Sequence, residues 1–231
     1  MKRLTLNNSD HSNAFANIAN TDTGRRASLG DPETASVSAK PSILKAHMAV
    51  RDATDKVARL TTDATRTDAA KHAAAAKVVT AATNEIAAAR NELERVGNEM
   101  INHGHAKFYA FANEAAAANG DVRQAAIGRW IQEQTKTPQG MAEIQKQAET
   151  NPRVAAELAL SESFILGLAP ETHKRLITDA FEKHTPEAAA EMEAGSDLLK
   201  QLPKMEQFAR DMHNHLYDAS VAAQSATRVE I

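Results

Sequence analysis

The sequence contains no cysteine, which excludes disulfides and thiolate metal sites anywhere in its 231 residues. Aromatic residues make up only 4% of the chain, and alanine supplies much of its 42% hydrophobic content. Because alanine removes little apolar area from water, we expect a thin core or one that a partner completes. No apolar run approaches the roughly 20 residues that a membrane-spanning helix needs, so we expect no transmembrane segment.

Glycine and proline, the two strongest helix breakers, are both absent between residues 42 and 96. A single helix of this length would extend about 80 Å, at about 1.5 Å per residue. The sequence therefore predicts an all-α fold in which residues 42–118 form a long, coiled-coil-like helical rod.

Apolar residues recur along this rod at the three- and four-residue spacing of a coiled-coil seam. Alanines fill many of the positions between the larger side chains, which favours close packing against another helix. We interpret the larger members as an interaction stripe for helix–helix assembly, comprising Ile43, Val50, Val57, Leu60, Val79, Ile86, Leu93, Val96 and Met100.

The stripe changes register between its two halves, because counting sevens from Ile43 reaches Val78 rather than Val79. One continuous helix is our preferred interpretation. The alternative is a break between Thr61 and Ala76, where a threonine-rich stretch has poorer helix propensity. We expect the first part of the rod to end around Gly104, before a helix resumes over residues 107–118.

Residues 1–41 are rich in Asn, Ser, Thr, Asp and Gly and have almost no periodic apolar residues. Such a composition does not supply enough apolar surface to offset the entropy of ordering the chain. We therefore expect either a flexible, disordered arm or an extended arm that becomes ordered only on a partner.

Residues 119–231 contain clear helix-start signals, which favour a compact C-terminal domain of short helices. Thr137, Asn151 and Thr185 each place a capping side chain before a proline at the first helical position. The predicted helices cover residues 122–135, 138–149, 152–166, 170–184 and 186–195. A last amphipathic helix is expected over residues 198–219, with a kink or restart near Gln201 because of Pro203.

The clearest candidates for metal chemistry are histidines that lie four residues from a carboxylate. Each such pair could supply half of a site, and the two pairs are Glu99 with His103 and Asp211 with His215. His105 and His213 lie two residues from these histidines and so point to other helix faces. Neither HExxH nor Glu-x-x-His occurs, and the motifs of nucleophilic catalysis and phosphate binding are absent as well. We therefore predict no catalytic residue, no cofactor and no metal.

Charge gives no indication of nucleic-acid binding. The chain has 27 Lys and Arg against 30 Asp and Glu, and acidic residues interrupt the basic ones along the rod. A surface of this kind would release few counterions from a phosphate backbone. Direct DNA or RNA binding is not expected.

Residues 151–158, 163–171 and 185–189 read NPRVAAEL, SFILGLAPE and TPEAA. These segments resemble uncharacterised helical structural or morphogenetic proteins of tailed phages and prophages of proteobacteria, which carry a pattern like V-A-x-x-x-L-x-x-x-x-F-L-x-G-L followed by a helix and an Ala/Glu-rich continuation. Two departures are the extra Ile165 before Leu166 and the Ala169-Pro170 pair in place of a polar cap. The resemblance spans about residues 120–195 and implies a virion-associated protein without catalytic residues.

These observations predict a non-enzymatic virion structural or assembly protein that acts through helix–helix contacts. It would be an internal or ejection protein, a scaffold or a head–neck component, located in the virion or in the host cytoplasm during assembly. Its partners would be further copies of itself or portal, capsid or ejection proteins. The alternative is a secreted bacterial effector whose disordered N-terminal segment directs export.

Overall fold

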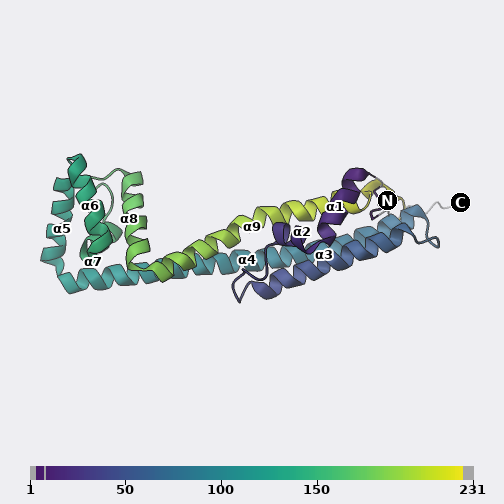
Figure 1. The fold of residues 1–231 in the computed structure, drawn as a ribbon, viewed down its shortest axis with the longest axis horizontal. Coiled ribbons are helices and arrows are strands. Elements are labelled where there is room, and N and C mark those ends of the chain that lie inside the picture. The colour runs from purple at the N-terminus through teal and green to yellow at the C-terminus, as the bar shows by residue number, and fades with distance from the viewer. Residues whose placement is uncertain (1–3, 8, 226–231) are drawn as a thin grey trace. The chain divides into compact units, whose positions relative to one another are not determined.

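The computed structural model describes residues 4–7 and 9–225, which contain helices and no strand. The expected all-α class is confirmed (Figure 1). The helices are α1 (Asp10–Asn20), α2 (Asp22–Leu29), α3 (Lys40–Thr61), α4 (Asp68–Asn119), α5 (Asp121–Gln134), α6 (Pro138–Thr150), α7 (Pro152–Leu160), α8 (Pro170–His184), α9 (Pro186–Leu216) and α10 (Ala219–Gln224).

The chain forms two compact units. Met1–Gly97 and Asp197–Ile231 make up the first unit, and Asn98–Ser196 makes up the second. Both boundaries fall inside helices, α4 and α9, rather than at the expected boundaries after residues 41 and 118. The end of the chain groups with its beginning because α9 continues through Pro203, and the residues after Pro203 pack in the first unit.

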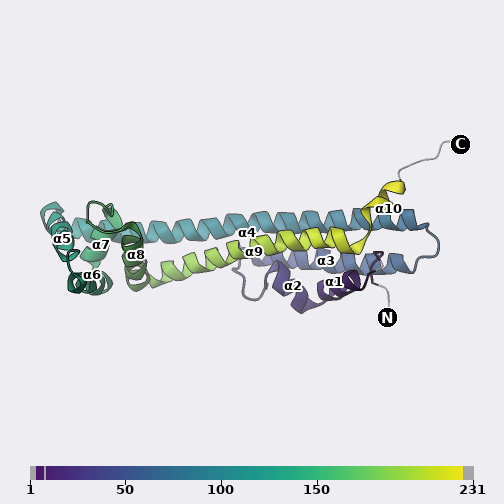
Figure 2. The same cartoon turned by 90° about the horizontal axis from the view of Figure 1, so that it is seen from above.

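In the first unit, α1 and α2 pack on α3, as Figures 1 and 2 both show. Lys45 of α3 lies 2.8 Å from Glu85 of α4, and Arg90 of α4 lies 2.7 Å from Glu206 of α9. Phe15 of α1 packs against Phe208 of α9 with ring centroids 5.4 Å apart. Helices from both ends of the sequence thus share one core.

The expectation of a flexible or extended arm over residues 1–41 is wrong for α1 and α2. The side chain of Ser9 accepts from the N–H of Ser12 and caps α1, and that of Thr21 accepts from the N–H of Gly24 and caps α2. Ala19 and Leu29 are fully buried. Two of the polar residues that suggested disorder are therefore helix caps, and Ala19 and Leu29 anchor the segment in the core.

The preferred single helix across residues 42–96 is also wrong, and the alternative break between Thr61 and Ala76 is confirmed. Helix α3 ends at Thr61 and α4 begins at Asp68. Between them, Oδ1 of Asp63 accepts from the hydroxyl of Thr65 at 2.6 Å and from its N–H at 2.8 Å. These bonds hold the pKa of Asp63 below its ordinary value. Such local bonds compete with the helix, which explains the turn here.

The rod does not end around Gly104, because α4 runs on to Asn119. A Cβ at Gly104 would lie 2.4 Å from Cγ of Met192 and 2.8 Å from the carbonyl oxygen of Ala188, both on α9. Gly104 therefore permits a close approach of α4 and α9 within the second unit. A residue that suggested a helix end is instead a packing position inside a helix.

The second unit encloses an apolar core between α5, α6, α7 and α8. Three predicted helices in this part of the chain match α5, α6 and α8 to within a residue at each end. Helix α7 ends at Leu160 rather than at residue 166, and α9 continues past residue 195 with no restart at Gln201. The buried core residues are Ile131, Ile144, Ala148, Val154, Ala155, Leu158, Leu166, Leu168, Leu176 and Ala180.

We predict that Gly104→Ala lowers the free energy of unfolding by about 1–3 kcal/mol, because the new methyl group overlaps Met192 and Ala188. Helix propensity alone would predict the opposite sign. Urea denaturation measures the change. Ala106→Ser adds one atom at an exposed position of α4 and should alter stability by less than about 0.5 kcal/mol. A Gly104→Ala protein as stable as the wild type would contradict the close approach.

Candidate functional site

The predicted interaction stripe lies mainly inside the chain's own core. Leu60 and Met100 are half-buried. The other members are at most 3% exposed: Ile43, Val50, Val57, Val79, Ile86, Leu93 and Val96. The stripe is thus covered by this chain and is not an open surface for a partner. The signal that could have revealed this is the second amphipathic stripe near the C-terminus, which includes the buried Met205, Met212 and Leu216.

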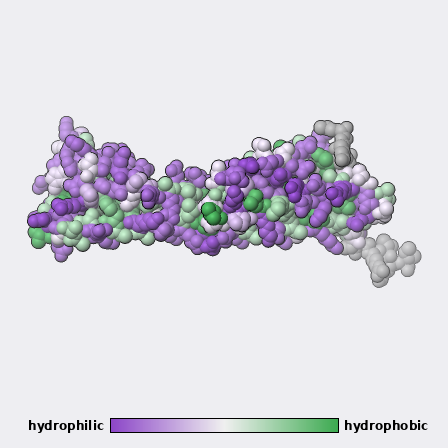
Figure 3. Space-filling view, turned by 60° about the horizontal axis from the view of Figure 1, so that its bottom comes forward, coloured by the Kyte–Doolittle hydropathy of each residue, from purple (hydrophilic) through white to green (hydrophobic). Residues whose placement is uncertain are grey.

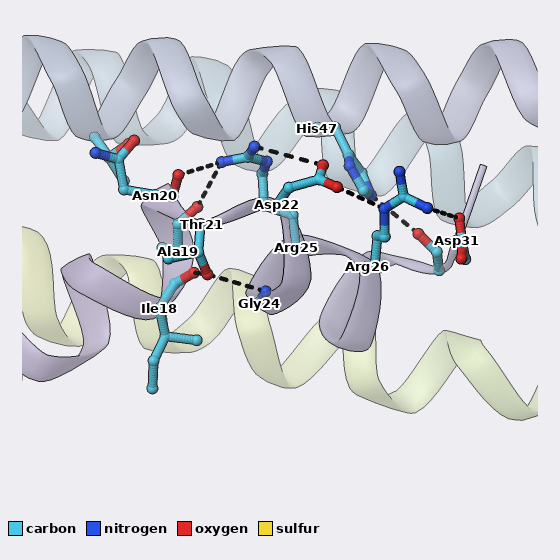
Figure 4. A network of polar contacts seen from close by, with 12 residues as sticks. Ile18, Ala19, Asn20, Thr21, Asp22, Gly24, Arg25, Arg26, Asp31 and His47 are labelled. Carbon is cyan, nitrogen blue, oxygen red and sulfur yellow. Dashed lines mark hydrogen bonds and ion pairs between the residues drawn. The ribbon is translucent and has the colours of Figure 1, made fainter. Parts of the chain in front are cut away.

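Polar side chains gather where α1, α2 and α3 meet (Figure 4). Arg25 is 8% exposed, and its guanidinium donates to the carbonyls of Ala19 at 3.1 Å and Asn20 at 2.8 Å. These are the last carbonyls of α1, and a positive charge at this end of a helix interacts favourably with the negative end of the helix dipole. Asp22 lies 3.8 Å from the same guanidinium. Arg25 therefore joins the end of α1 to α2.

His47 of α3 continues this network to the end of α2. Its Nε2–H donates to the carbonyl of Gly30 at 3.0 Å, and Gly30 has a φ of +94°. Burial lowers the pKa of His47, although the bond to Gly30 opposes the shift. Arg26 donates to both Asp22 and Asp31, and these bonds raise its pKa. The network binds helix ends together and is a structural feature of the first unit.

The histidines expected to supply half-sites bond to groups other than a metal. Nδ1 of His103 lies 2.8 Å from a carboxylate oxygen of Glu191, and Nδ1 of His215 lies 3.3 Å from the hydroxyl of Ser12. The ring of His215 also contacts that of His11, with centroids 4.8 Å apart. In residues 4–7 and 9–225, no three His, Asp or Glu side chains gather in a way that could hold a metal ion.

An open groove of about 630 Å³ lies between α4, α8 and α9 in the second unit; we call it the acidic groove. Its apolar lining includes Phe108, Ile177, Phe181 and Met192. Phe108 and Phe181 pack edge to face, with ring centroids 4.8 Å apart at 71°. This aromatic contact gives the groove a preformed floor. The volume of the groove is in the range typical of ligand sites.

Polar residues of the acidic groove include Glu182 of α8 and Glu193 of α9, both exposed. His105, Thr178 and Ser196 also line it. No Lys or Arg is among its lining residues. The groove thus combines an apolar floor with carboxylates, a surface that suits cationic, amphipathic ligands.

A second exposed feature is the turn over residues 161–169, between α7 and α8. The N–H of Leu168 donates to Ser163 at 2.9 Å and that of Gly167 donates to Phe164 at 3.3 Å, which is the bond pair of a Schellman motif. Gly167 has the positive φ, +68°, that the motif requires.

This turn holds apolar side chains both inside and outside the unit. Leu166 and Leu168 are 0% and 7% exposed, and they anchor the turn in the core. Phe164 is 78% exposed and Ile165 is 48% exposed. The face in Figure 3 is mostly hydrophilic, with small and separate hydrophobic areas. An aromatic side chain held in water by a closed turn is therefore a candidate contact residue.

No protein-family model, curated protein or solved structure matches this chain. None of the helices in the part of the chain that the structure describes is long and apolar enough to cross a membrane.

If the stripe is core, Leu93→Ala should destabilise the first unit by about 2–5 kcal/mol without changing the oligomeric state. Denaturant unfolding and sedimentation measure these two effects. The exposed neighbour Asn91 provides a control, because Asn91→Ala should change stability little. A Leu93→Ala protein of unchanged stability that dissociates from a larger assembly would instead favour an interface.

His47 should make the protein less stable in acid. Because its pKa is lower in the folded state than its ordinary value of 6.5, the unfolded chain binds more protons as pH falls below about 6.5. Stability is then lost as pH decreases from 7 to 5, and His47→Gln should lose less over this range. His105→Gln changes an exposed histidine and should keep the wild-type slope. Equal slopes for all three proteins would show that burial of His47 has no such effect.

Proposed function

We propose that this protein is a non-enzymatic structural or assembly protein of a tailed-phage virion, which acts by binding other proteins. The resemblance over about residues 120–195 supports the phage assignment. The helical architecture agrees with a role in contacts rather than chemistry. Its place of action would be the virion, or the host cytoplasm during assembly.

The observation that carries the proposal is the exposed Phe164 on its closed turn. Phe164 and Gly167 belong to the segment that resembles phage proteins, so the resemblance and the exposed side chain coincide. Because the turn is bonded internally and Leu166 and Leu168 anchor it, Phe164 has little backbone freedom to lose on binding. Such preorganisation lowers the entropy cost of an interface.

The partner would be a portal, capsid or ejection protein, or a second copy of this chain. The contact surface differs from the predicted stripe, which is buried. The alternative role as a secreted effector relied on a disordered beginning, and α1 and α2 remove that support.

Phe164→Ala should reduce binding to the virion partner by about tenfold or more, as expected for an aromatic hot spot. The tagged full chain is co-expressed with the portal, capsid and ejection genes that neighbour its own, and the captured proteins are identified by mass spectrometry. Sedimentation of the purified chain measures self-association in parallel.

Val122→Ala is the matched control, because Val122 is 82% exposed in the same unit but lies outside the turn. It should leave capture unchanged. The proposal is wrong if the wild type retains no virion protein and also stays monomeric, or if Phe164→Ala binds as the wild type does. Neighbouring genes without portal or capsid functions would also contradict it.

A further inference from the structure

We infer that the acidic groove is a docking site for a basic amphipathic helix of a partner protein. The groove is a different surface from the turn that carries Phe164. The inference therefore goes beyond the proposed function and holds whether or not the protein belongs to a phage.

The shape of the groove fits a helix. Along α9 its lining residues include Pro186, Ala189, Ala190, Glu193 and Ser196, which share one face at three- and four-residue spacing. From Pro186 to Ser196 this face extends about 15 Å, the length of roughly three helical turns. The small side chains of Ala189, Ala190 and Ser196 let a second helix approach closely. A docked helix would present apolar anchors at positions i, i+3 or i+4 and i+7.

The floor of the groove can receive those anchors without rearranging. Phe108 and Phe181 are 3% and 8% exposed, and their edge-to-face contact fixes both rings. Ile177 and Met192 are half-buried beside them. The flexible thioether of Met192 can adapt to anchors of different shape. The floor therefore favours Leu, Ile or Phe side chains on the partner.

The charges decide which amphipathic helix fits. Glu182 and Glu193 are exposed, on different helices, and neither makes an ion pair among the described residues. Glu191, which does not line the groove, differs from them because it has ion-pair partners. Its carboxylate bonds to His103 at 2.8 Å and Lys107 at 2.9 Å, and these bonds lower its pKa. His103 and Lys107 are thus bonded to Glu191, while the two groove carboxylates have no ion-pair partner among the described residues. A helix with Lys or Arg beside its apolar face would supply the missing partners.

The test measures fluorescence anisotropy of a labelled helical peptide of about 15 residues, in which Leu occupies one face and Lys the other. A matched peptide has Glu in place of Lys. The full-length protein should bind the Lys peptide and should bind the Glu peptide much more weakly. Glu182→Gln with Glu193→Gln should weaken binding about 3- to 10-fold, since each exposed ion pair contributes modestly. Ala190→Trp should fill the groove and weaken binding at least about tenfold.

Glu114→Gln with Glu133→Gln is the control, because it removes the same charge from exposed positions of the second unit outside the groove. It should bind the Lys peptide as the wild type does. Circular dichroism confirms that each variant is folded. The inference is overturned if the Lys peptide does not bind, if the control loses as much affinity as the groove variant, or if Ala190→Trp has no effect. It is also overturned if the groove proves to hold a second copy of the chain, shown by self-association that Ala190→Trp abolishes while peptide binding persists.

Discussion

The fold of the first unit depends on burying a thin apolar stripe along α3 and α4. Alanine contributes much of the apolar surface in these helices, so only close packing on several sides can exclude water from it. The covering elements come from both ends of the sequence: α1 and α2 from the beginning, and the residues of α9 after Pro203 from the end. This shared need explains why Met1–Gly97 and Asp197–Ile231 form one unit.

The second unit also buries its apolar residues by close packing, and it does so mainly between short helices. Gly104 allows α4 to approach α9, and the core between α5 and α8 anchors the turn through Leu166 and Leu168. Because Leu166 and Leu168 fill the core, Phe164 and Ile165 remain exposed to solvent. The carboxylates of the acidic groove are exposed as well. The two surfaces we assign to binding are thus consequences of how the core closes. The turn exposes the apolar side chains of Phe164 and Ile165, and the groove exposes carboxylates above a floor of buried aromatic rings.

Local signals allowed several elements to be predicted from the sequence. Thr137 before Pro138 and Asn151 before Pro152 correctly mark the starts of α6 and α7, because capping and the φ of proline act within a few residues. The threonine-rich stretch that carried the alternative break begins at Thr61, the last residue of α3, although one continuous helix was the preferred prediction. The prediction of a flexible arm was wrong over residues 10–29, because short helices with Ser and Thr caps and disordered polar segments have similar compositions. What separates them is the burial of Ala19 and Leu29, which depends on distant helices.

The all-α class and most helix starts in the second unit could be predicted from the sequence alone, and the sequence also located the segment of poor helix propensity where the turn between α3 and α4 lies. These depend on propensity, capping and periodicity, all of which act over one or two helical turns. Tertiary packing was needed to show that the stripe is core, that Gly104 is a packing position and that Pro203 lies inside a continuous helix. It also decided that Phe164 and the acidic groove are exposed. Each of these outcomes depends on which distant segments cover a given face, and spacing along the chain does not contain that information.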